Sequence, residues 1–278
     1  MCVVTGANRG LGFATAEGLA RDGATVVVAC RNMAKGEEAA ERVRAAAGHE
    51  RVEALPLDLA EPASVEGFVA ALGARYDRVD VLVNNAGITL LDRQLSCLGV
   101  ELGWHVQYLG HYQLTRRLLP LLTAGAPARV IHLAGMYQSK GQLVLDDLDW
   151  SRRPWDWGQA GADAQLARVM FSAELAARLR GTGVTVNAVH PGAVRTHAQD
   201  VLPLHLRILI DTVMRVAFVA PARGARTVLR LAEDEDLADT TGRWFRRYRV
   251  QEPHPLCHDA QARQALWAKS AELLGMEP

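Results

Sequence analysis

Short β-branched runs alternate with segments of helical periodicity along most of the chain. Predicted strands cover residues 3–4, 25–29, 52–57, 79–83, 128–133 and 184–189. Predicted helices cover residues 14–21, 33–47, 64–72, 100–122, 163–180 and 223–232. Because consecutive parallel strands need crossover helices, this alternation predicts an α/β fold, a doubly wound parallel sheet with helices on both faces.

The 278 residues contain no internal repeat, low-complexity tract or Pro/Ser-rich linker. A chain of this length that is 49% hydrophobic can bury one large core, so we expect a single domain. The most apolar late segment, residues 201–220, includes His205, Arg207, Asp211 and Arg215. These side chains favour an amphipathic helix over a membrane span. The first predicted strand begins almost at Met1, which leaves open whether a short N-terminal extension is missing.

Charge and cysteine usage exclude several classes of function. The 31 basic and 31 acidic side chains give a formal net charge of zero, so long-range attraction favours neither nucleic acid nor an anionic membrane. The cysteines stand far apart and form no CxxC or Cys/His ligand pattern: Cys2, Cys30, Cys97 and Cys257. Isolated thiols are typical of a reducing compartment. Since the N-terminus carries no secretory signal, we expect a cytoplasmic protein with no metal site.

A glycine-rich segment, Thr5-Gly6-Ala7-Asn8-Arg9-Gly10-Leu11-Gly12, lies between the first predicted strand and the first predicted helix. Gly6 permits the tight turn, Gly10 lets the backbone approach a pyrophosphate, and Gly12 allows close packing of the helix on the strand. The helix N-terminus then faces the negative phosphates. A glycine triplet alone is a weak signal, but in this strand–turn–helix context it predicts a dinucleotide-binding loop.

The end of the second predicted strand indicates which dinucleotide binds. An acidic side chain there would hydrogen-bond the adenosine ribose and repel a 2′-phosphate. This chain has Cys30 followed by Arg31, and Arg9 lies in the glycine loop. Two guanidinium groups near the ribose favour the phosphorylated cofactor through charge-assisted hydrogen bonds. We therefore expect NADP(H) in preference to NAD(H).

Further motifs make the chain similar to the short-chain dehydrogenase/reductase family, and most of all to its retinol-dehydrogenase-like branch. Besides the TGxxxGxG loop, the motifs are Ala29-Cys30-Arg31-Asn32, Asp58-Leu59, Asn84-Asn85-Ala86-Gly87, Leu109-Gly110-His111-Tyr112 and His190-Pro191-Gly192-Ala193-Val194-Arg195-Thr196. The resemblance covers nearly the whole chain and implies a Rossmann fold. It also implies that Asp58 and Leu59 contact the adenine, and that Thr196 and the backbone near Val194 hold the nicotinamide carboxamide.

The resemblance suggests a division of the single Rossmann-type domain 1–278. A dinucleotide-binding core covers 1–196, a substrate lid with late elements covers 197–250, and a C-terminal helix region covers 251–278. The expected cofactor-binding residues are Gly6, Asn8, Arg9, Gly10, Leu11, Gly12, Arg31, Asn32, Asp58, Leu59, Asn85, Ala86, Gly87, Gln165, Pro191, Gly192, Val194 and Thr196.

The family's catalytic side chains are absent where the resemblance would put them. Members are expected to use Asn, Ser, Tyr and Lys, because hydride transfer leaves an alkoxide that must be protonated or stabilised. Alignment on Leu109-Gly110-His111 puts Gln107 at the Asn position, and alignment on the strand 130–133 puts Gly135 at the Ser position. The match of residues 165–168 to the family's Lys-Leu-Ala-Asn puts Gln165 at the Lys position and Gly161 at the Tyr position. No tyrosine in the chain is followed four residues later by a lysine.

Tyr137 and Lys140 are the nearest local substitutes, since they follow the fifth strand at the carboxyl edge where such folds bind ligands. Their spacing is three rather than four and they lie in a loop, so surface residues are the commoner explanation for such a pair. Asp163 stands two residues, about 200° of helix, from Gly161 and should face away from the cofactor. His111 belongs to a motif shared with active relatives, and we interpret it as structural.

Residues 197–220 correspond to the family's variable substrate lid. Their apolar side chains suggest a lipophilic ligand or a partner surface, although ordinary core packing explains about half of them. Three tryptophans that precede the altered helix are candidates for a pocket wall: Trp150, Trp155 and Trp157. As partner we expect a lipophilic small molecule, with neither nucleic acid nor a membrane span, and a homodimer stays open.

Three functions fit a retained nucleotide site beside a lost proton-transfer apparatus. The favoured hypothesis is an NADP(H)-binding, repurposed enzyme with non-standard chemistry on a lipophilic small molecule. The second is a catalytically inactive pseudoenzyme that serves as a nucleotide-responsive binding module. The third is an NADP-dependent oxidoreductase with a surrogate acid, for which the candidate catalytic residues are Tyr137, Lys140 and Gln107. Since function belongs to sites rather than folds, the fold alone does not choose among them.

Overall fold

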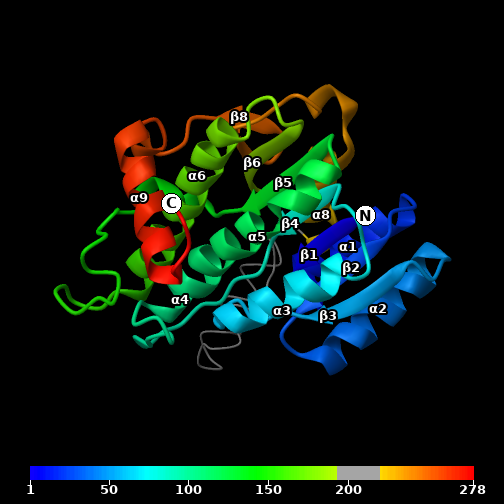
Figure 1. The fold of residues 1–278 in the computed structure, drawn as a ribbon, viewed down its shortest axis with the longest axis horizontal. Coiled ribbons are helices and arrows are strands. Elements are labelled where there is room, and N and C mark those ends of the chain that lie inside the picture. Colours follow the sequence, from blue (N-terminus) through cyan, green and yellow to red (C-terminus); the bar gives the residue numbers. More distant parts are fainter. Residues whose placement is uncertain (193–219) are drawn as a thin grey trace.

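One sheet forms the centre of the molecule (Figure 1). The computed structural model describes residues 1–192 and 220–278. Within these ranges the sheet has eight strands in the order β3-β2-β1-β4-β5-β6-β7-β8. Neighbouring strands pair in parallel, except that β7 and β8 are antiparallel. The strands are β1 (Cys2–Thr5), β2 (Val26–Cys30), β3 (Val52–Pro56), β4 (Val81–Asn84), β5 (Ala128–Leu133), β6 (Val184–His190), β7 (Trp244–Arg246) and β8 (Arg249–Gln251).

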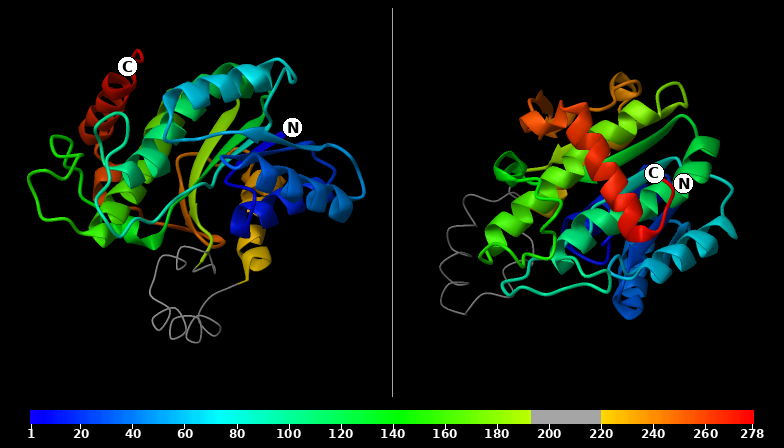
Figure 2. Two further views of the ribbon diagram at one scale, coloured as in Figure 1. Left: turned by 90° about the horizontal axis from the view of Figure 1, so that it is seen from below. Right: turned by 60° about the vertical axis from the view of Figure 1, so that its left-hand side comes forward.

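Helices cover both faces of the sheet (Figure 2). One layer contains α1 (Gly10–Arg21), α2 (Met33–Ala47) and α8 (Pro221–Glu233). The other contains α3 (Pro62–Gly73), α5 (Gly110–Ala124), α6 (Trp157–Arg178) and α9 (Ala260–Leu274). Val3 and Val4 of β1 are wholly buried in opposite layers, because a parallel sheet covered on both faces needs apolar side chains at every position. The predicted doubly wound α/β fold is confirmed.

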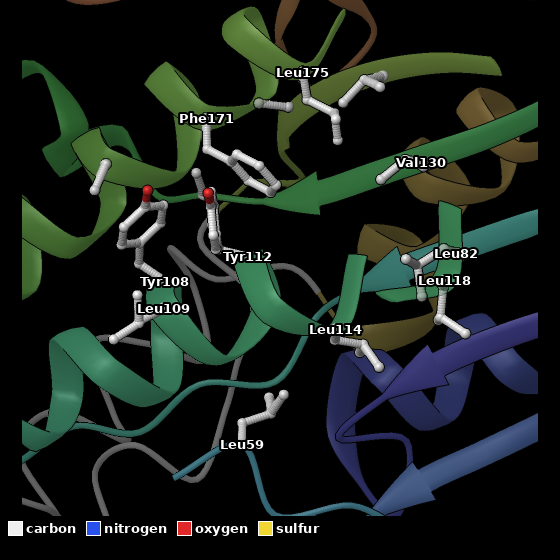
Figure 3. Close-up of a cluster of buried hydrophobic side chains, with 14 of the residues drawn as sticks. Leu59, Leu82, Tyr108, Leu109, Tyr112, Leu114, Leu118, Val130, Phe171 and Leu175 are labelled. Carbon is white, nitrogen blue, oxygen red and sulfur yellow. The ribbon is translucent and has the colours of Figure 1, made fainter. Parts of the chain in front are cut away.

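An aromatic cluster fixes α6 in place (Figure 3). The ring centroid of Phe171 on α6 lies 5.1 Å from that of Tyr112, and Tyr112 is 5.1 Å from Trp267 of α9. Tyr108 shares a 2.7 Å hydrogen bond with Ser270 of the same helix. Aromatic pairs in tilted and edge-on arrangements add about 0.5–1.5 kcal/mol each to the burial of their surface. The helix that carries Gly161 and Gln165 is therefore anchored over its second half.

α6 begins earlier than the predicted start at residue 163. Asp156 caps its N-terminus by accepting hydrogen bonds from the backbone N–H groups of Gly158 (2.8 Å) and Gln159 (3.0 Å). An aspartate at this position satisfies donors that the helix itself leaves unpaired. Trp157, which we expected to precede this helix, is its first residue.

The helix predicted over residues 100–122 is confirmed in its extent, since residues 102–124 are continuously helical, but it is not a uniform α-helix. The structure has a short α4 (Leu102–Trp104), a π-helical segment (His105–Leu109) and then α5. Gly110 at the junction packs so closely that a Cβ atom would lie 2.3 Å from the carbonyl oxygen of Leu59. A π-helical turn shifts the following side chains around the axis, and apolar periodicity does not reveal such a shift.

Part of the predicted substrate lid lies outside the described residues. That part is residues 197–219, which include most of the predicted amphipathic segment 201–220. Val194 and Thr196, which we expected to hold the cofactor, also lie outside the described residues. The remainder of 197–250 forms α8, β7 and β8, and the two strands have no counterpart in the prediction because runs of three residues show no clear alternation. None of the helices in the described ranges is long and apolar enough to cross a membrane.

Candidate nucleotide and ligand site

The glycine loop turns sharply at the carboxyl end of β1. Gly6 and Gly10 have φ angles of +66° and +60°, and α1 begins at Gly10. These angles favour glycine because other residues pay a steric cost there. A Cβ on Gly12 would lie 2.5 Å from Nδ2 of Asn85 and 2.6 Å from the carbonyl oxygen of Gly6. Each glycine is thus fixed by a turn or a close contact.

Two side chains hold this loop against the segment that follows β4. The hydroxyl of Thr5 accepts hydrogen bonds from the backbone N–H groups of Asn85 and Ala86, both at 2.9 Å. The side-chain amide of Asn85 donates to the carbonyl oxygen of Thr5 at 2.7 Å. These contacts join two expected cofactor segments into one rigid edge of the sheet.

The Arg31 guanidinium lies at the carboxyl end of β2, with its side chain 77% exposed. Its Nε is 4.0 Å from Oδ2 of Asp58, a distance at which an exposed ion pair contributes little. Asn32 caps α2 by accepting a 3.0 Å hydrogen bond from the N–H of Lys35. Arg9, the N-cap residue of α1, is also exposed. Arg31 therefore faces solvent at the place where an adenosine 2′-phosphate would be recognised.

The remaining expected cofactor residues line the same edge. Leu11 and Leu59 are buried, and Asn8 is half-buried. A Cβ built on Gly87 would lie 3.6 Å from the Gln107 side chain. Pro191 and Gly192 directly follow β6 and are buried. This edge has a glycine turn that leads into the N-terminus of α1, and no atom of the described residues lies within 4 Å of a Cβ built on Gly10. Such an edge suits a dinucleotide, which supplies a hydride when bound.

A cavity of about 320 Å³ lies beside this edge, between α6 and the loop that follows β4. Its apolar wall comes from Ile88, Leu90, Trp155 and Trp157, and its polar atoms from Thr89, Glu101, Gln107, Tyr137 and Gln165. Trp155 is oriented by a 2.7 Å hydrogen bond from its indole N–H to the carbonyl oxygen of Leu91. A mostly apolar cavity with a few polar groups is typical of a site for a small organic molecule.

Gly135 and Gln165 fit one another. A Cβ on Gly135 would lie 2.2 Å from Oε1 of Gln165 and 2.9 Å from its Cδ. The Gln165 carboxamide therefore occupies the space that a side chain at residue 135 would need. Its Oε1 is buried and has no hydrogen-bond partner among the described residues, which leaves an acceptor unsatisfied at the edge of the cavity.

Gly161 contributes empty space to the cavity wall. It lies on α6 one turn before Gln165, and no described atom comes within 4 Å of its would-be Cβ. The cavity is therefore wider here than it would be with any larger side chain. Among the four tetrad positions, Gln107, Gly161 and Gln165 line the cavity, and Gly135 lies behind Gln165.

Tyr137 and Lys140 lie on a 3-10 helix, Met136–Lys140, rather than in an irregular loop. Tyr137 lines the cavity but is 65% exposed, and Nζ of Lys140 is 5.9 Å from its ring centroid. Asp163 is not among the residues that line the cavity. It accepts hydrogen bonds from the N–H of Gln142 (2.7 Å) and pairs with Arg153 at 3.0 Å.

The expected tryptophan wall is formed in part. Trp155 and Trp157 line the cavity, whereas Trp150 is buried beneath the Arg153 guanidinium, 3.6 Å from its ring centroid. Burial raises the pKa of Asp163, and its hydrogen bonds and Arg153 act in the opposite direction. Arg153 and Asp163 thus tie the loop 141–153 to α6 and play no part in the cavity itself.

A buried arginine that we did not single out from the sequence lies between the two halves of the site. Arg168 on α6 is 4% exposed, and its guanidinium donates to the backbone carbonyl oxygens of Gln107, Leu133 and Ala86. Its Nη2 also lies 2.9 Å from Nδ1 of His111. Burial lowers the pKa of Arg168 to about 9. The only available sequence signal was an arginine at the position of the family's Asn after Lys-Leu-Ala.

Two buried histidines, His111 and His132, lie near this arginine, and a third, His105, is buried on the preceding π-helical segment. Burial lowers the pKa of His105 to about 4 and that of His132 to about 3, with Arg168 adding to the effect on His132. Burial, followed by the charge of Arg168, also lowers the pKa of His111 well below its usual range. All three rings are therefore neutral at physiological pH. Among the described residues, no group of His, Cys, Asp and Glu side chains could hold a metal ion.

A glycine turn and an apolar cavity at the carboxyl edge of a doubly wound sheet define a Rossmann-type, nucleotide-dependent oxidoreductase scaffold. The sequence profile of the family described as enoyl-(acyl carrier protein) reductase matches residues 6–243. Human retinol dehydrogenase 13 is 38% identical over 99% of this chain and 84% of its own length. The chain belongs to the short-chain dehydrogenase/reductase family and is retinol-dehydrogenase-like.

Solved structures agree with this assignment. An uncharacterized protein from Mycobacterium paratuberculosis has a TM-score of 0.79 and 33% identity, covering 99% of this chain and 93% of that one. The Pseudomonas aeruginosa RhlG/NADP active-site complex has a TM-score of 0.70 and 26% identity, covering 88% and 93%. The expected family and fold are thereby confirmed.

Proposed function

We propose that this protein binds NADP(H) and a lipophilic small molecule, and that it acts on this ligand without the Asn, Ser, Tyr and Lys expected of its family. The observation that carries the proposal is the wall of the cavity. Gly161 leaves it open where a tyrosine would stand, and Gln165 fills the space beside Gly135 where a serine would stand. The ligand half of the site is therefore shaped around different side chains.

The nucleotide half supports cofactor binding. Gly6, Gly10 and Gly12 form the turn, Thr5 and Asn85 lock it, and Arg31 is exposed at the end of β2. The Pseudomonas aeruginosa relative was solved with NADP. An exposed guanidinium that pairs only loosely with Asp58, at 4.0 Å, is available to a 2′-phosphate, which it favours over a bare ribose hydroxyl. We infer a preference for NADP(H) over NAD(H) on this ground.

The ligand half supports an apolar substrate. Ile88, Leu90, Trp155 and Trp157 form most of the wall, and the name of the human relative is that of an enzyme for retinol. Bound cofactor would supply a hydride, and the chain must then orient the ligand and handle its proton. The carboxamides of Gln107 and Gln165 can hydrogen-bond a polar end of the ligand, but neither can transfer a proton as a general acid does.

The loss of a positioned general acid typically costs about 10²–10⁴ in rate. We therefore expect reduction of simple aldehydes and ketones by the family mechanism to be slow. The primary experiment is a titration of the protein with NADPH and NADH, followed by cofactor fluorescence. NADPH binding at least about tenfold tighter than NADH binding, lost in Arg31→Gln and kept in Arg21→Gln, supports the proposal; equal or absent binding contradicts it.

One observation favours a second function, ordinary oxidoreduction with a surrogate acid. Tyr137 lines the cavity, and the Lys140 ammonium lies over its ring. The test is NADPH oxidation with a panel of lipophilic aldehydes, comparing the protein with Tyr137→Phe. A loss of turnover of about a hundredfold or more in this variant would establish the surrogate. Binding of NADPH with no turnover of any ligand would instead favour the pseudoenzyme.

A further inference from the structure

Arg168 carries a positive charge into the interior of the protein on α6. Among residues 1–192 and 220–278 no carboxylate pairs with it, and all four of its polar contacts are to neutral acceptors. A buried charge is tolerated only when its donors are satisfied. The acceptors come from the ends of β4 and β5 and from the π-helical segment, so the guanidinium joins three segments at the carboxyl edge of the sheet.

The contact between Arg168 and His111 depends on which ring nitrogen of His111 carries the proton. Nδ1 of His111 lies 2.9 Å from Nη2 of Arg168 and 3.0 Å from the carbonyl oxygen of Gln107. If Nδ1 carried the proton it would donate to that oxygen, but the N–H would also face an N–H of the guanidinium. If Nδ1 is bare, it accepts a charge-assisted hydrogen bond, which is about twice as strong as a neutral one.

The other ring nitrogen faces the glycine loop. Nε2 of His111 lies 3.0 Å from the hydroxyl oxygen of Thr5, the last residue of β1. That oxygen already accepts from the N–H groups of Asn85 and Ala86, and it can donate to the carbonyl oxygen of Val83 at 3.4 Å. With two donors in place, the hydroxyl by itself would prefer to give its proton to Nε2.

The two neighbours of His111 thus compete for its tautomer. Thr5 alone favours a proton on Nδ1, whereas Arg168 favours a proton on Nε2. Because the guanidinium is charged and buried, its preference is the stronger one. In the resulting arrangement Arg168 donates to His111 and His111 donates to Thr5. The Thr5 oxygen then shares its two lone pairs among three N–H donors and gives its own proton to the carbonyl oxygen of Val83. Hydrogen bonds thus run from α6 to the first residue of the glycine turn.

We propose that Arg168 is a positioning residue for the nucleotide site, which it shapes by holding His111 in the Nε2–H tautomer and thereby pinning Thr5 and the glycine loop. The inference rests on the proposed binding of NADP(H) to that loop. It gives α6 a function in the nucleotide half of the site although its residues at positions 161 and 165 have changed. Arg168 touches neither the expected cofactor nor the ligand in this role.

The tautomer can be measured without any cofactor, by ¹⁵N NMR of the histidine ring nitrogens in the intact protein, with the His111 signals assigned from His111→Gln. We expect a protonated Nε2 and a bare Nδ1 in the wild type. Arg168→Met should move the proton to Nδ1, toward Gln107, and weaken NADPH binding about tenfold, as the loss of one charge-assisted hydrogen bond would. Arg168→Lys keeps a cationic donor and should keep the tautomer and most of the affinity.

Circular dichroism and thermal unfolding identify variants that fold. If Arg168→Met does not fold, the wild-type tautomer and Arg168→Lys still decide the matter. A proton on Nδ1 in the wild type overturns the proposal, and so does unchanged NADPH affinity in a folded variant whose tautomer has moved. A wild type that has the expected tautomer but binds no NADPH contradicts the proposed function instead, so the two failures are distinguishable.

Discussion

The two halves of the site differ in the packing around one glycine in each, Gly12 in the nucleotide half and Gly161 in the ligand half. At the nucleotide half, a Cβ on Gly12 would meet the backbone of Gly6 at 2.6 Å, and Thr5 and Asn85 lock the turn with hydrogen bonds shorter than 3.0 Å. At the ligand half, Gly161 has open space around its would-be Cβ, and Oε1 of Gln165 has no described partner. The nucleotide half is therefore closely packed around its turn, whereas the ligand half has open space where the family would have a reactive side chain.

Lowering the pH should have the largest effect on the free energy of unfolding, and it should act through buried histidines near the nucleotide half. Burial lowers the pKa of His105 to about 4 and of His132 to about 3, and it lowers the pKa of His111 as well. The unfolded chain then binds more protons than the folded one below pH 6.5, so stability is present above that pH and is lost as the pH falls. His105 and His132 should each cost about 2 kcal/mol between pH 7 and pH 5, and His111 acts in the same direction.

Urea unfolding at pH 7, 6 and 5 measures this slope. His132→Gln should reduce it by about one proton, or about 1.4 kcal/mol per pH unit. His258→Gln, which changes an exposed histidine, is the matched control. A free energy of unfolding that stays constant from pH 7 to pH 5 would show that these rings are not held neutral by burial.

Gly12→Ala should damage the nucleotide half most among single substitutions. Its Cβ would meet a backbone oxygen and the amide of Asn85, and neither can move without opening the turn. Forcing a methyl group into such a contact costs about 1–3 kcal/mol, and NADPH affinity should fall at least about tenfold. Gly67→Ala is the control, because Gly67 lies in α3 and, apart from its own helix, no described atom comes within 4 Å of its would-be Cβ. Equal NADPH affinities of Gly12→Ala and Gly67→Ala would show that close packing at Gly12 is not needed for cofactor binding.

Gly135→Ser tests whether the two altered residues of the ligand half depend on one another. The new Cβ would collide with Oε1 of Gln165, which is the far end of a flexible side chain and can rotate away. We expect a destabilisation of about 1 kcal/mol from the displaced rotamer. In a Gln165→Ala background the same change should cost almost nothing, which gives a coupling of about 1 kcal/mol in a double-mutant cycle of urea unfolding. If the two substitutions have additive effects on the free energy of unfolding, Gly135 and Gln165 do not depend on one another.

The difference between the halves also explains what the sequence could predict. The glycine turn was predictable because Gly6, Gly10 and Gly12 each have a conformational or packing reason that depends only on nearby residues. The fold was predictable because buried parallel strands leave near-continuous apolar runs. The absence of a YxxxK pair was visible in the residues themselves.

The contacts between distant segments were not predictable. The fit of Gln165 over Gly135 joins residues 30 positions apart, and Arg168 reaches Ala86 across 82 positions. No local pattern marks such pairs, because each depends on how α6 packs against the ends of β4 and β5. Arg168 in particular would be assigned to the surface by its charge, since arginine is rarely buried without a carboxylate.

Gly161→Ala should have the smallest effect, and its sign decides whether the ligand half is open. The residue lies inside α6, and glycine within a helix costs about 0.5–1 kcal/mol relative to alanine. With no described atom within 4 Å of the new methyl group, nothing offsets that gain. Urea unfolding should therefore show a stabilisation of about 0.5–1 kcal/mol, and NADPH affinity should stay as it was. A destabilisation would mean that the space beside Gly161 is filled in solution, and a loss of NADPH affinity would mean that this glycine serves the cofactor rather than the cavity.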